Sequence, residues 1–261
     1  MKKTLQQLKE LITEGGKNIV ITTHRGPDGD ALGSSLAMYH FLIQFNHKVH
    51  VITPTDYASF LHWLPDNNKV INFEDNVEIA NKITNQADII FLLDFNNISR
   101  LANYQDVVKS SNATKILIDH HEDPDYEIAD IIFSEPQASA TAEIIYTIIS
   151  KLDMDNIINK DIAECLYVGI MTDTGSFKYS STTSITHEII AKLISCGANN
   201  AKIHNLIFEN SSSNRIKLLG YCLNNKLLIY PENKSAIISL TEEELNSFNF
   251  KRGDTEGIVN Y

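Results

Sequence analysis

Hydrophobic positions along the chain alternate between short continuous runs and runs with helical spacing. Three continuous runs, Ile19 to Ile21, Ile89 to Leu93 and Ile116 to Ile118, are each soon followed by acidic or histidine residues. Runs of this kind are typical of strands buried on both faces of a sheet. Apolar residues at helical spacing over Ala31 to Phe45 and Asn76 to Thr84 predict helices between the strands. We therefore expect an α/β fold, with a parallel sheet and helices on both of its faces.

The pattern changes after a further apolar run at Ile131 to Phe133. Helical spacing then dominates, and Ser139 is a plausible cap for the first of these helices. The polar run Glu209 to Asn214 is the best candidate for a linker. Two short strands are expected beyond it, at Lys226 to Tyr230 and Ala236 to Leu240, before a final helix. We therefore expect three parts: a sheet domain over residues 1–208, a linker helix over 209–224, and a small, partial α/β lobe over 225–261.

A short turn between the first strand and the next helix carries His24, Asp28 and Asp30. Two carboxylates held this close repel each other unless a cation lies between them. Each residue also has an ordinary explanation, because Asp30 can be a helix N-cap, Asp28 a turn residue and His24 a packed core histidine. Together, however, the three side chains indicate a metal site, since a helix N-terminus favours the ionised carboxylates that bind metals.

Acidic and histidine side chains also follow two of the other predicted strands. Asp94 ends one apolar run, and Asp119 to His121 follow another. Because ligands collect at the carboxyl ends of parallel strands, we expect these residues to lie near the first turn. Asp173, close to threonines and glycine near the end of an apolar helix, is a fourth candidate. Ordinary chemistry at a helix C-terminus is the alternative explanation for Asp173.

Composition restricts the possible partners. The 261 residues carry a formal net charge of −11, from 22 basic and 33 acidic side chains. This balance disfavours a protein that binds long duplex nucleic acid through a broad basic surface. The three cysteines form no CxxC pair, which argues against a zinc knuckle or a disulfide framework. The sequence contains no apolar stretch of signal-peptide or membrane-spanning length, so we expect a cytoplasmic protein that does not bind membranes.

The candidate residues fall into four ordered motifs: His24-Arg25-Gly26-Pro27-Asp28-Gly29-Asp30, Leu93-Asp94 with Arg100 downstream, Asp119-His120-His121, and Gly169-Ile170-Met171-Thr172-Asp173-Thr174-Gly175. They resemble, in the same order, the motifs of the DHH phosphoesterase family, which is named for the third. The first matches the family pattern H-x-x-x-D-x-D. The resemblance covers about residues 1–225. A lone Asp-His-His triplet would mean little, but four motifs in the family's order make chance agreement improbable.

The resemblance implies a two-metal phosphoesterase. The family pattern would use six ligands: His24 and Asp28 for one ion, Asp30, His120 and Asp173 for the other, and Asp94 as a bridge. Imidazole and carboxylate donors without thiolates favour manganese, with magnesium and iron as alternatives. The two ions would then activate a water, and the resulting hydroxide would attack phosphorus in line.

The same resemblance implies roles for two further residues, Asp119 and His121. Asp119 would orient a metal ligand through a histidine ring N–H. His121 would contact the scissile phosphate or protonate the leaving oxygen, with simple packing as the alternative. Arg25, Arg100 and Lys178 are the basic residues near the motifs. Arg100 is the preferred substrate-binding candidate, although each of the three is more often a surface or salt-bridging residue.

Within the family, the chain resembles the bacterial nano-RNases and the RecJ-like and exopolyphosphatase-related proteins. This implies hydrolysis of short oligoribonucleotides, adenosine 3′,5′-bisphosphate or both. The alternatives are a pyrophosphatase or exopolyphosphatase, and a nucleotide-binding module without catalysis. Residues 226–261 resemble only the first part of the family's DHHA1 lobe, because its G-G-G-H segment is missing. An open sheet edge in such a half-lobe would favour a homodimer, so the expected partners are a small nucleotide or short RNA and a second copy of the chain.

Overall fold

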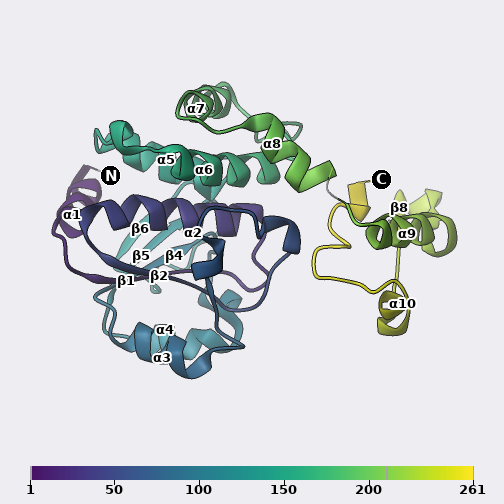
Figure 1. The fold of residues 1–261 in the computed structure, drawn as a ribbon, viewed down its shortest axis with the longest axis horizontal. Coiled ribbons are helices and arrows are strands. Elements are labelled where there is room, and N and C mark those ends of the chain that lie inside the picture. The colour runs from purple at the N-terminus through teal and green to yellow at the C-terminus, as the bar shows by residue number, and fades with distance from the viewer. Residues whose placement is uncertain (1, 210, 261) are drawn as a thin grey trace.

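The computed structural model describes residues 2–209 and 211–260, and its helices and strands are shown in Figure 1. Met1, Asn210 and Tyr261, which the expected domain boundaries and linker include, lie outside the described residues. Within the described ranges, no helix combines the length and the apolar character needed to cross a membrane.

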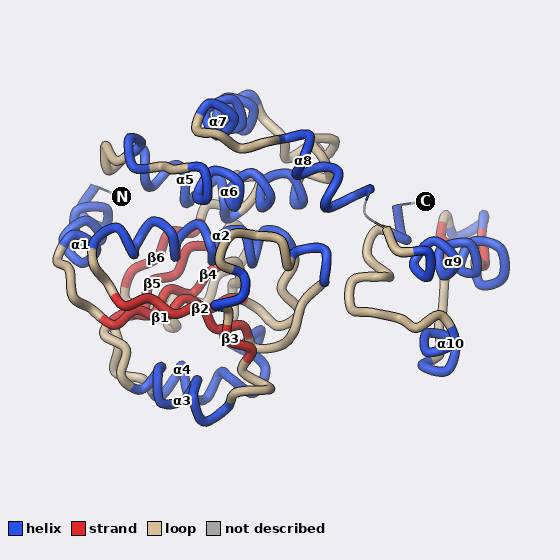
Figure 2. Tube along the Cα trace, in the orientation of Figure 1, coloured by secondary structure: helices blue, strands red, loops and turns tan. Residues whose placement is uncertain are grey.

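A parallel sheet forms the centre of the larger part of the molecule (Figure 2). In the described residues it has six strands, in the spatial order β3-β2-β1-β4-β5-β6. Every neighbouring pair is parallel, which confirms the predicted α/β class. The strands are β1 (Asn18–Thr23), β2 (Lys48–Thr53), β3 (Ile71–Asn72), β4 (Ile89–Leu93), β5 (Thr114–Asp119) and β6 (Ile131–Ser134).

Helices cover both faces of this sheet (Figure 1). Helices α3 and α4 lie on one face, whereas α1, α2, α5 and α6 lie on the other, with α7 and α8 further out. The sheet-domain helices are α1 (Lys2–Thr13), α2 (Gly29–Leu42), α3 (Val77–Asn85), α4 (Gln105–Ser110), α5 (Thr141–Lys151), α6 (Lys160–Asp173), α7 (Ser184–Ser195) and α8 (Asn200–His204).

Strand β4 shows why the apolar runs are continuous. Its side chains alternate between two cores: Ile89 and Phe91 belong to the core beneath α2 and α6, and Ile90 and Leu92 to the core beneath α3 and α4. All of them are buried. Because both faces are covered, neither set of alternating positions needs to be polar.

Glycines allow α2 and α6 to approach closely. A Cβ on Gly33 of α2 would lie 2.5 Å from the backbone carbonyl oxygen of Cys165 in α6, and one on Gly29 would collide with Thr172. On the other side of the contact, a Cβ on Gly169 of α6 would lie 2.7 Å from the Asp30 carboxylate. The start of α2, with Asp28 and Asp30, is therefore held against the end of α6.

The C-terminal part forms a separate lobe (Figure 1), which contacts the sheet domain where Arg252 donates to the Thr55 hydroxyl and Arg215 lies over the Phe60 ring. It contains α9 (Ser213–Tyr221), β7 (Leu228–Tyr230), β8 (Ser235–Ile237) and α10 (Glu242–Ser247). Leu218, Cys222 and Ile258 form its small buried cluster. We retain the division into residues 1–208, 209–224 and 225–261 as a proposal.

The two predicted C-terminal strands exist but are shorter than expected. The first begins at Leu228 because Cys222–Lys226 continue helically from α9. The second ends at Ile237, since Ile237 pairs with Leu228 and no partner residue lies beyond it in this hairpin. The predicted extension to Leu240 is therefore wrong. Every residue of the two strands is exposed.

Candidate active site

The turn after β1 holds Asp28 and His24 against each other. Asp28 is the N-cap of α2, and its Oδ1 accepts hydrogen bonds from the backbone N–H groups of Asp30 at 3.1 Å and Ala31 at 3.0 Å. The capping role that the sequence allowed for Asp30 thus belongs to Asp28. The other oxygen, Oδ2, lies 3.7 Å from Nε2 of His24, so this carboxylate both ends the turn and faces the histidine.

Asp30 is fully buried and caps a different helix. Its Oδ2 accepts the N–H of Thr141 at 2.6 Å, and its Oδ1 accepts the N–H of Ala142 at 2.9 Å, both at the start of α5. The predicted cap, Ser139, is wrong: its hydroxyl donates to Glu143, and Ala140 at the N-cap position has no side-chain bond. The free N–H groups of α5 therefore stabilise a carboxylate that is distant in sequence.

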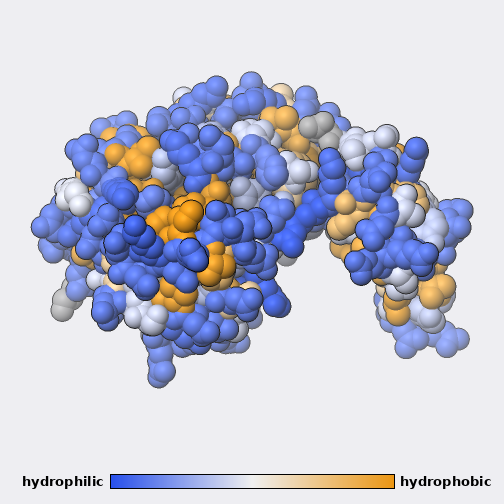
Figure 3. Space-filling model, turned by 60° about the horizontal axis from the view of Figure 1, so that its bottom comes forward, coloured by the Kyte–Doolittle hydropathy of each residue, from blue (hydrophilic) through white to orange (hydrophobic). Residues whose placement is uncertain are grey.

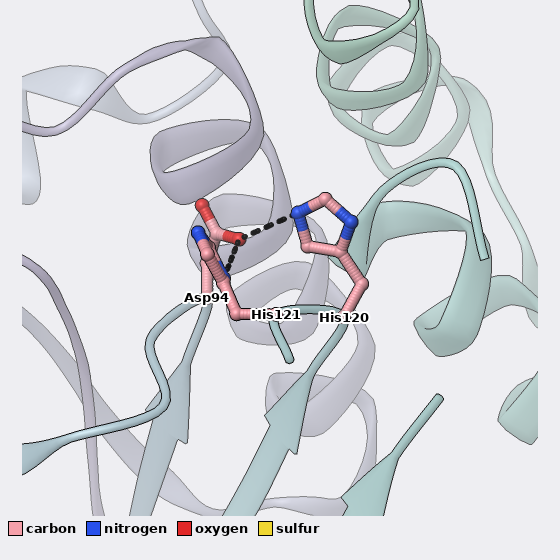
Figure 4. A group of neighbouring side chains, drawn as sticks. All are labelled: Asp94, His120 and His121. Carbon is pink, nitrogen blue, oxygen red and sulfur yellow. Dashed lines mark ion pairs between the residues drawn. The ribbon is translucent and has the colours of Figure 1, made fainter. Parts of the chain in front are cut away.

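Asp94 lies at the centre of the cluster (Figure 4). It follows β4 in the left-handed backbone region, with φ of +65°. Its Oδ2 lies 3.5 Å from Nε2 of His24, and its Oδ1 lies 3.6 Å from Nε2 of His120. The hydroxyl of Thr141 donates to Oδ1 at 3.0 Å. Thr141 is a residue that the sequence reasoning missed, because no motif spacing distinguishes it from an ordinary first residue of a helix.

The two histidines of the triplet have different partners. Nε2 of His120 lies 3.1 Å from Oδ2 of Asp173, and its Nδ1 lies 3.4 Å from the Ala138 carbonyl oxygen. Nδ1 of His121 lies 2.7 Å from Oδ1 of Asp119. We expected Asp119 to orient a metal ligand, but its hydrogen-bond partner is His121 rather than His120. Asp119 is fully buried, and its Oδ2 has no hydrogen-bond partner among the described residues.

All six predicted metal ligands come together. The described part of the chain contains three groups of three side chains, and within each group the possible ligand atoms lie within 4.8 Å of one another. The first two match the sets that the motifs predicted, and the third adds His121 to the shared residues. The groups are His24, Asp28 and Asp94; Asp30, His120 and Asp173; and Asp94, His120 and His121.

Repulsion and burial shift the pKa values in this cluster. Burial, then the charges of Asp94 and Asp173, hold the pKa of Asp30 well above its ordinary value. Burial also opposes ionisation of Asp94, but the hydrogen bond and charge of His24 outweigh it and lower the pKa of Asp94. For His120, burial is outweighed by Asp173, which raises the pKa to about 9. The cluster thus concentrates negative charge that positive charge must balance.

The three basic residues named from the sequence differ in their exposure to solvent. Arg25 is exposed, and its backbone N–H donates to the Arg100 carbonyl oxygen at 2.7 Å, which ties the first turn to the segment after β4. Arg100 itself is half-buried. Lys178 is exposed and lines a cleft next to Asp28 and Asp173.

Comparison with known proteins assigns the family. Residues 18–170 match the family model described as "DHH family, N-terminal domain", which is more than half of the chain. The chain belongs to the DHH family. The resemblance found in the four motifs is therefore confirmed, and relatives of this family include hydrolases that act on phosphate esters.

Three relatives illustrate the range of the family. The chain is 38% identical to a crystal structure of an exopolyphosphatase-related protein from Bacteroides fragilis, with a TM-score of 0.94 over 100% of this chain and 76% of that one. It is 27% identical to the bifunctional oligoribonuclease and PAP phosphatase NrnA of Bacillus subtilis, over 92% of this chain and 72% of the relative. It is 26% identical to a probable manganese-dependent inorganic pyrophosphatase of Lactobacillus delbrueckii subsp. bulgaricus, over 67% of this chain and 53% of the relative. The chain thus spans between about half and about three quarters of these proteins.

Proposed function

We propose that this DHH-family chain is a metal-dependent phosphoesterase that hydrolyses short oligoribonucleotides, adenosine 3′,5′-bisphosphate or both. The observation that carries the proposal is a pair of His/Asp groups, His24/Asp28/Asp94 and Asp30/His120/Asp173, that lie next to each other because Oδ1 of Asp94 is 3.6 Å from Nε2 of His120. Two-metal sites of this kind position and stabilise phosphoryl groups. The similarity to an oligoribonuclease and PAP phosphatase supports the substrate class. A small nucleotide or short RNA is accordingly the proposed partner.

The donor set suits divalent cations. Four carboxylates lie around two imidazoles, and mutual repulsion raises the pKa values of Asp28 and Asp30 beyond the effect of burial. A cation between them would remove this repulsion. We propose the six ligands expected from the motifs, with manganese as the metal, because all donors are imidazole or carboxylate and a pyrophosphatase relative is manganese-dependent by name. When bound, two such ions would supply a nucleophile at neutral pH and neutralise charge on the phosphate oxygens.

His121 and Asp119 are the proposed proton-handling pair. Nδ1–H donates to the buried Asp119 carboxylate, which leaves Nε2 for the substrate. The doubly protonated ring carries on Nε2 the proton that passes to the leaving oxygen, and the Asp119 carboxylate balances the charge of the ring. The side chain of His121 is 34% exposed, so it is accessible to a substrate bound beside Asp94. In this arrangement Asp119 fixes the orientation of the ring, and His121 protonates the leaving oxygen or contacts the scissile phosphate. Arg100 is proposed to bind substrate phosphate.

The function is tested by comparing three substrates in the presence of Mn²⁺: a diadenylate, adenosine 3′,5′-bisphosphate and pyrophosphate. We expect mononucleotide release from the first or phosphate release from the second, and loss of both after EDTA treatment. Exclusive hydrolysis of pyrophosphate would replace the proposal with a pyrophosphatase. If metal binds but no substrate is hydrolysed, the chain is a binding module.

The role of His121 has its own test. We expect His121→Gln to reduce kcat by a factor on the order of 10² to 10⁴, the usual contribution of a general acid, and to leave Mn²⁺ affinity unchanged. A loss of Mn²⁺ affinity equal to that of a ligand variant would make His121 a metal ligand instead.

A further inference from the structure

A cleft of about 680 Å³ separates the sheet domain from the C-terminal part. Figure 3 shows the corresponding hollow between the two parts, with hydrophobic surface on its C-terminal side. Asp28 and Asp173 line the cleft, so it opens directly onto the acidic cluster. Its volume suits a ligand of drug or dinucleotide size, far larger than pyrophosphate.

Two exposed aromatic side chains line this cleft. Tyr179 is 48% exposed and Phe208 is 49% exposed, although both are large rings. Tyr179 packs closely over Gly175, where a Cβ would collide with the ring, and Phe208 lies 5.9 Å from the ring of His204. Each ring therefore packs against a neighbouring residue on one side and is exposed to solvent on another. Flat apolar surfaces of this kind stack with nucleobases of any sequence.

The backbone that presents Tyr179 is unusual. Gly175, Ser176 and Phe177 follow one another in the left-handed region, with φ values of +55°, +61° and +65°. Such conformations are unfavourable for residues with side chains and persist where surrounding structure enforces them, often at functional sites. The hydroxyl of Thr174 accepts the N–H of Phe177 at 3.0 Å, which helps to fix the turn. The turn reverses the chain just after Asp173 and brings Tyr179 back to the cleft.

Positive charge lies beside these rings. Lys178 lines the cleft and forms no ion pair within the described residues. Arg215, on the C-terminal side, stacks 5.9 Å from the ring of Phe60 and donates to the backbone carbonyl oxygen of Glu256 at 2.9 Å. Among the described residues neither cation has a carboxylate within 4.0 Å, although Arg215 is attracted to the more distant Glu256 carboxyl. Both remain able to attract phosphate.

Two carboxylates on the C-terminal wall oppose an anionic ligand. The Asp254 carboxylate accepts a hydrogen bond from the backbone N–H of Lys251 at 2.7 Å, which stabilises the turn between these two residues. Glu256 lines the same wall, where its backbone carbonyl oxygen accepts a hydrogen bond from Arg215 at 2.9 Å. Lys178 and Tyr179 are adjacent on the opposite wall, together with Asp28 and Asp173, whose charges the proposed metal ions would balance.

We propose that Tyr179, Phe208 and Lys178 form a nucleotide subsite, in which a ring stacks on a nucleobase and Lys178 binds the phosphate of a neighbouring nucleotide. The inference rests on the proposed function and narrows it to single-stranded oligonucleotides. Aromatic and basic residues beside a catalytic cluster favour a substrate with both bases and phosphates. Pyrophosphate offers no base, so the subsite gives it no advantage.

The test measures binding separately from turnover. Binding of 5′-phosphorylated diadenylate and of pyrophosphate to the EDTA-treated chain is followed by calorimetry, and hydrolysis is followed with Mn²⁺. We expect Tyr179→Ala and Phe208→Ala each to weaken diadenylate binding about tenfold, within the range measured for base stacking. Pyrophosphate binding should not change, and KM for diadenylate should rise while kcat holds. Tyr179→Phe keeps the ring and should bind normally.

Tyr230→Ala is the matched control, because Tyr230 is a similarly exposed ring, at 44%, in β7 and outside the cleft. Lys178→Gln should make the salt dependence of diadenylate binding shallower by about 0.7 in log–log slope, the value for one single-strand phosphate contact. If diadenylate is hydrolysed but the three cleft variants behave like Tyr230→Ala, the subsite is refuted and the function stands. If diadenylate binds through these residues but is not hydrolysed, the subsite stands and the proposed function fails. Absence of both binding and hydrolysis refutes both.

Discussion

Replacing Thr141 by valine tests how the cluster holds its central carboxylate. The Thr141 hydroxyl donates to Oδ1 of Asp94 at 3.0 Å, and both residues are buried. Valine has nearly the same shape, so Thr141→Val removes one hydrogen bond and keeps the backbone N–H that Asp30 accepts. A hydrogen bond to a charged group contributes about 1.5–3 kcal/mol. Because the bond orients a proposed metal ligand, we expect Mn²⁺ affinity to fall about 10- to 100-fold.

Calorimetric titration of the EDTA-treated protein with Mn²⁺ measures this effect, alongside the unfolding temperature of the metal-free form. Thr141→Ser keeps the hydroxyl and should bind Mn²⁺ nearly as the parent does. Thr147→Val is the matched control on the same helix, since the Thr147 hydroxyl donates to the Glu143 backbone carbonyl oxygen rather than to the cluster. Parent-like Mn²⁺ affinity in Thr141→Val would refute the reasoning, as would equal losses in the serine and valine variants.

Three further outcomes follow from the structure. Asp94→Asn should lose more turnover than substitution of any other single ligand, because both proposed ions lose a donor, and steady-state assays at saturating Mn²⁺ check this. Gly33→Ala should destabilise the fold by about 1–3 kcal/mol in chemical denaturation because its Cβ meets an α6 carbonyl, whereas Gly220→Ala, with open space around it, should be neutral or stabilising. Hydrogen bonding by Lys226 lowers the pKa of Glu244 to about 2, so its stabilising effect is complete above pH 4.5 and is lost as the pH falls towards 2; the difference in unfolding temperature between the parent and Glu244→Gln should shrink over that range.

Much of the sheet domain could be predicted because its sequence pattern and its burial agree. Strand β4 is apolar at every position because its alternate side chains are buried in two separate cores. Parallel strands then determine where the functional side chains lie, because the carboxyl ends of these strands are at the same edge of the sheet. That geometry brings Asp94 and Asp119, which follow or end neighbouring strands, to the same place. The division of the ligands into two sets came from the resemblance to the family's motifs, and it stays a prediction.

The contacts that hold these ligands could not be predicted in the same way. Asp30 accepts N–H groups from Thr141 and Ala142, more than a hundred residues away in sequence. Local rules assign a cap to the nearest suitable side chain, which is why Ser139 was expected to cap α5. A buried carboxylate packed against the helix start satisfies the same N–H groups and excludes that choice. Likewise, the pairing of Asp119 with His121 depends on side-chain direction, which the triplet does not specify.

The backbone at Asp94 determines which substitution can report on its chemistry. A residue at the end of a strand normally stays extended, but Asp94 adopts φ of +65° while its N–H still donates to the Ile118 carbonyl oxygen at 3.1 Å. Aspartate and asparagine tolerate this left-handed region, whereas for other side chains it costs about 1–2 kcal/mol. Asp94→Ala therefore combines loss of the carboxylate with backbone strain, and a fall in its unfolding temperature says nothing about metal binding. Asp94→Asn removes the charge alone. If the asparagine variant were as unstable as the alanine variant, the left-handed conformation would not be the cause, and the buried charge pairs with His24 and His120 would account for the stability instead.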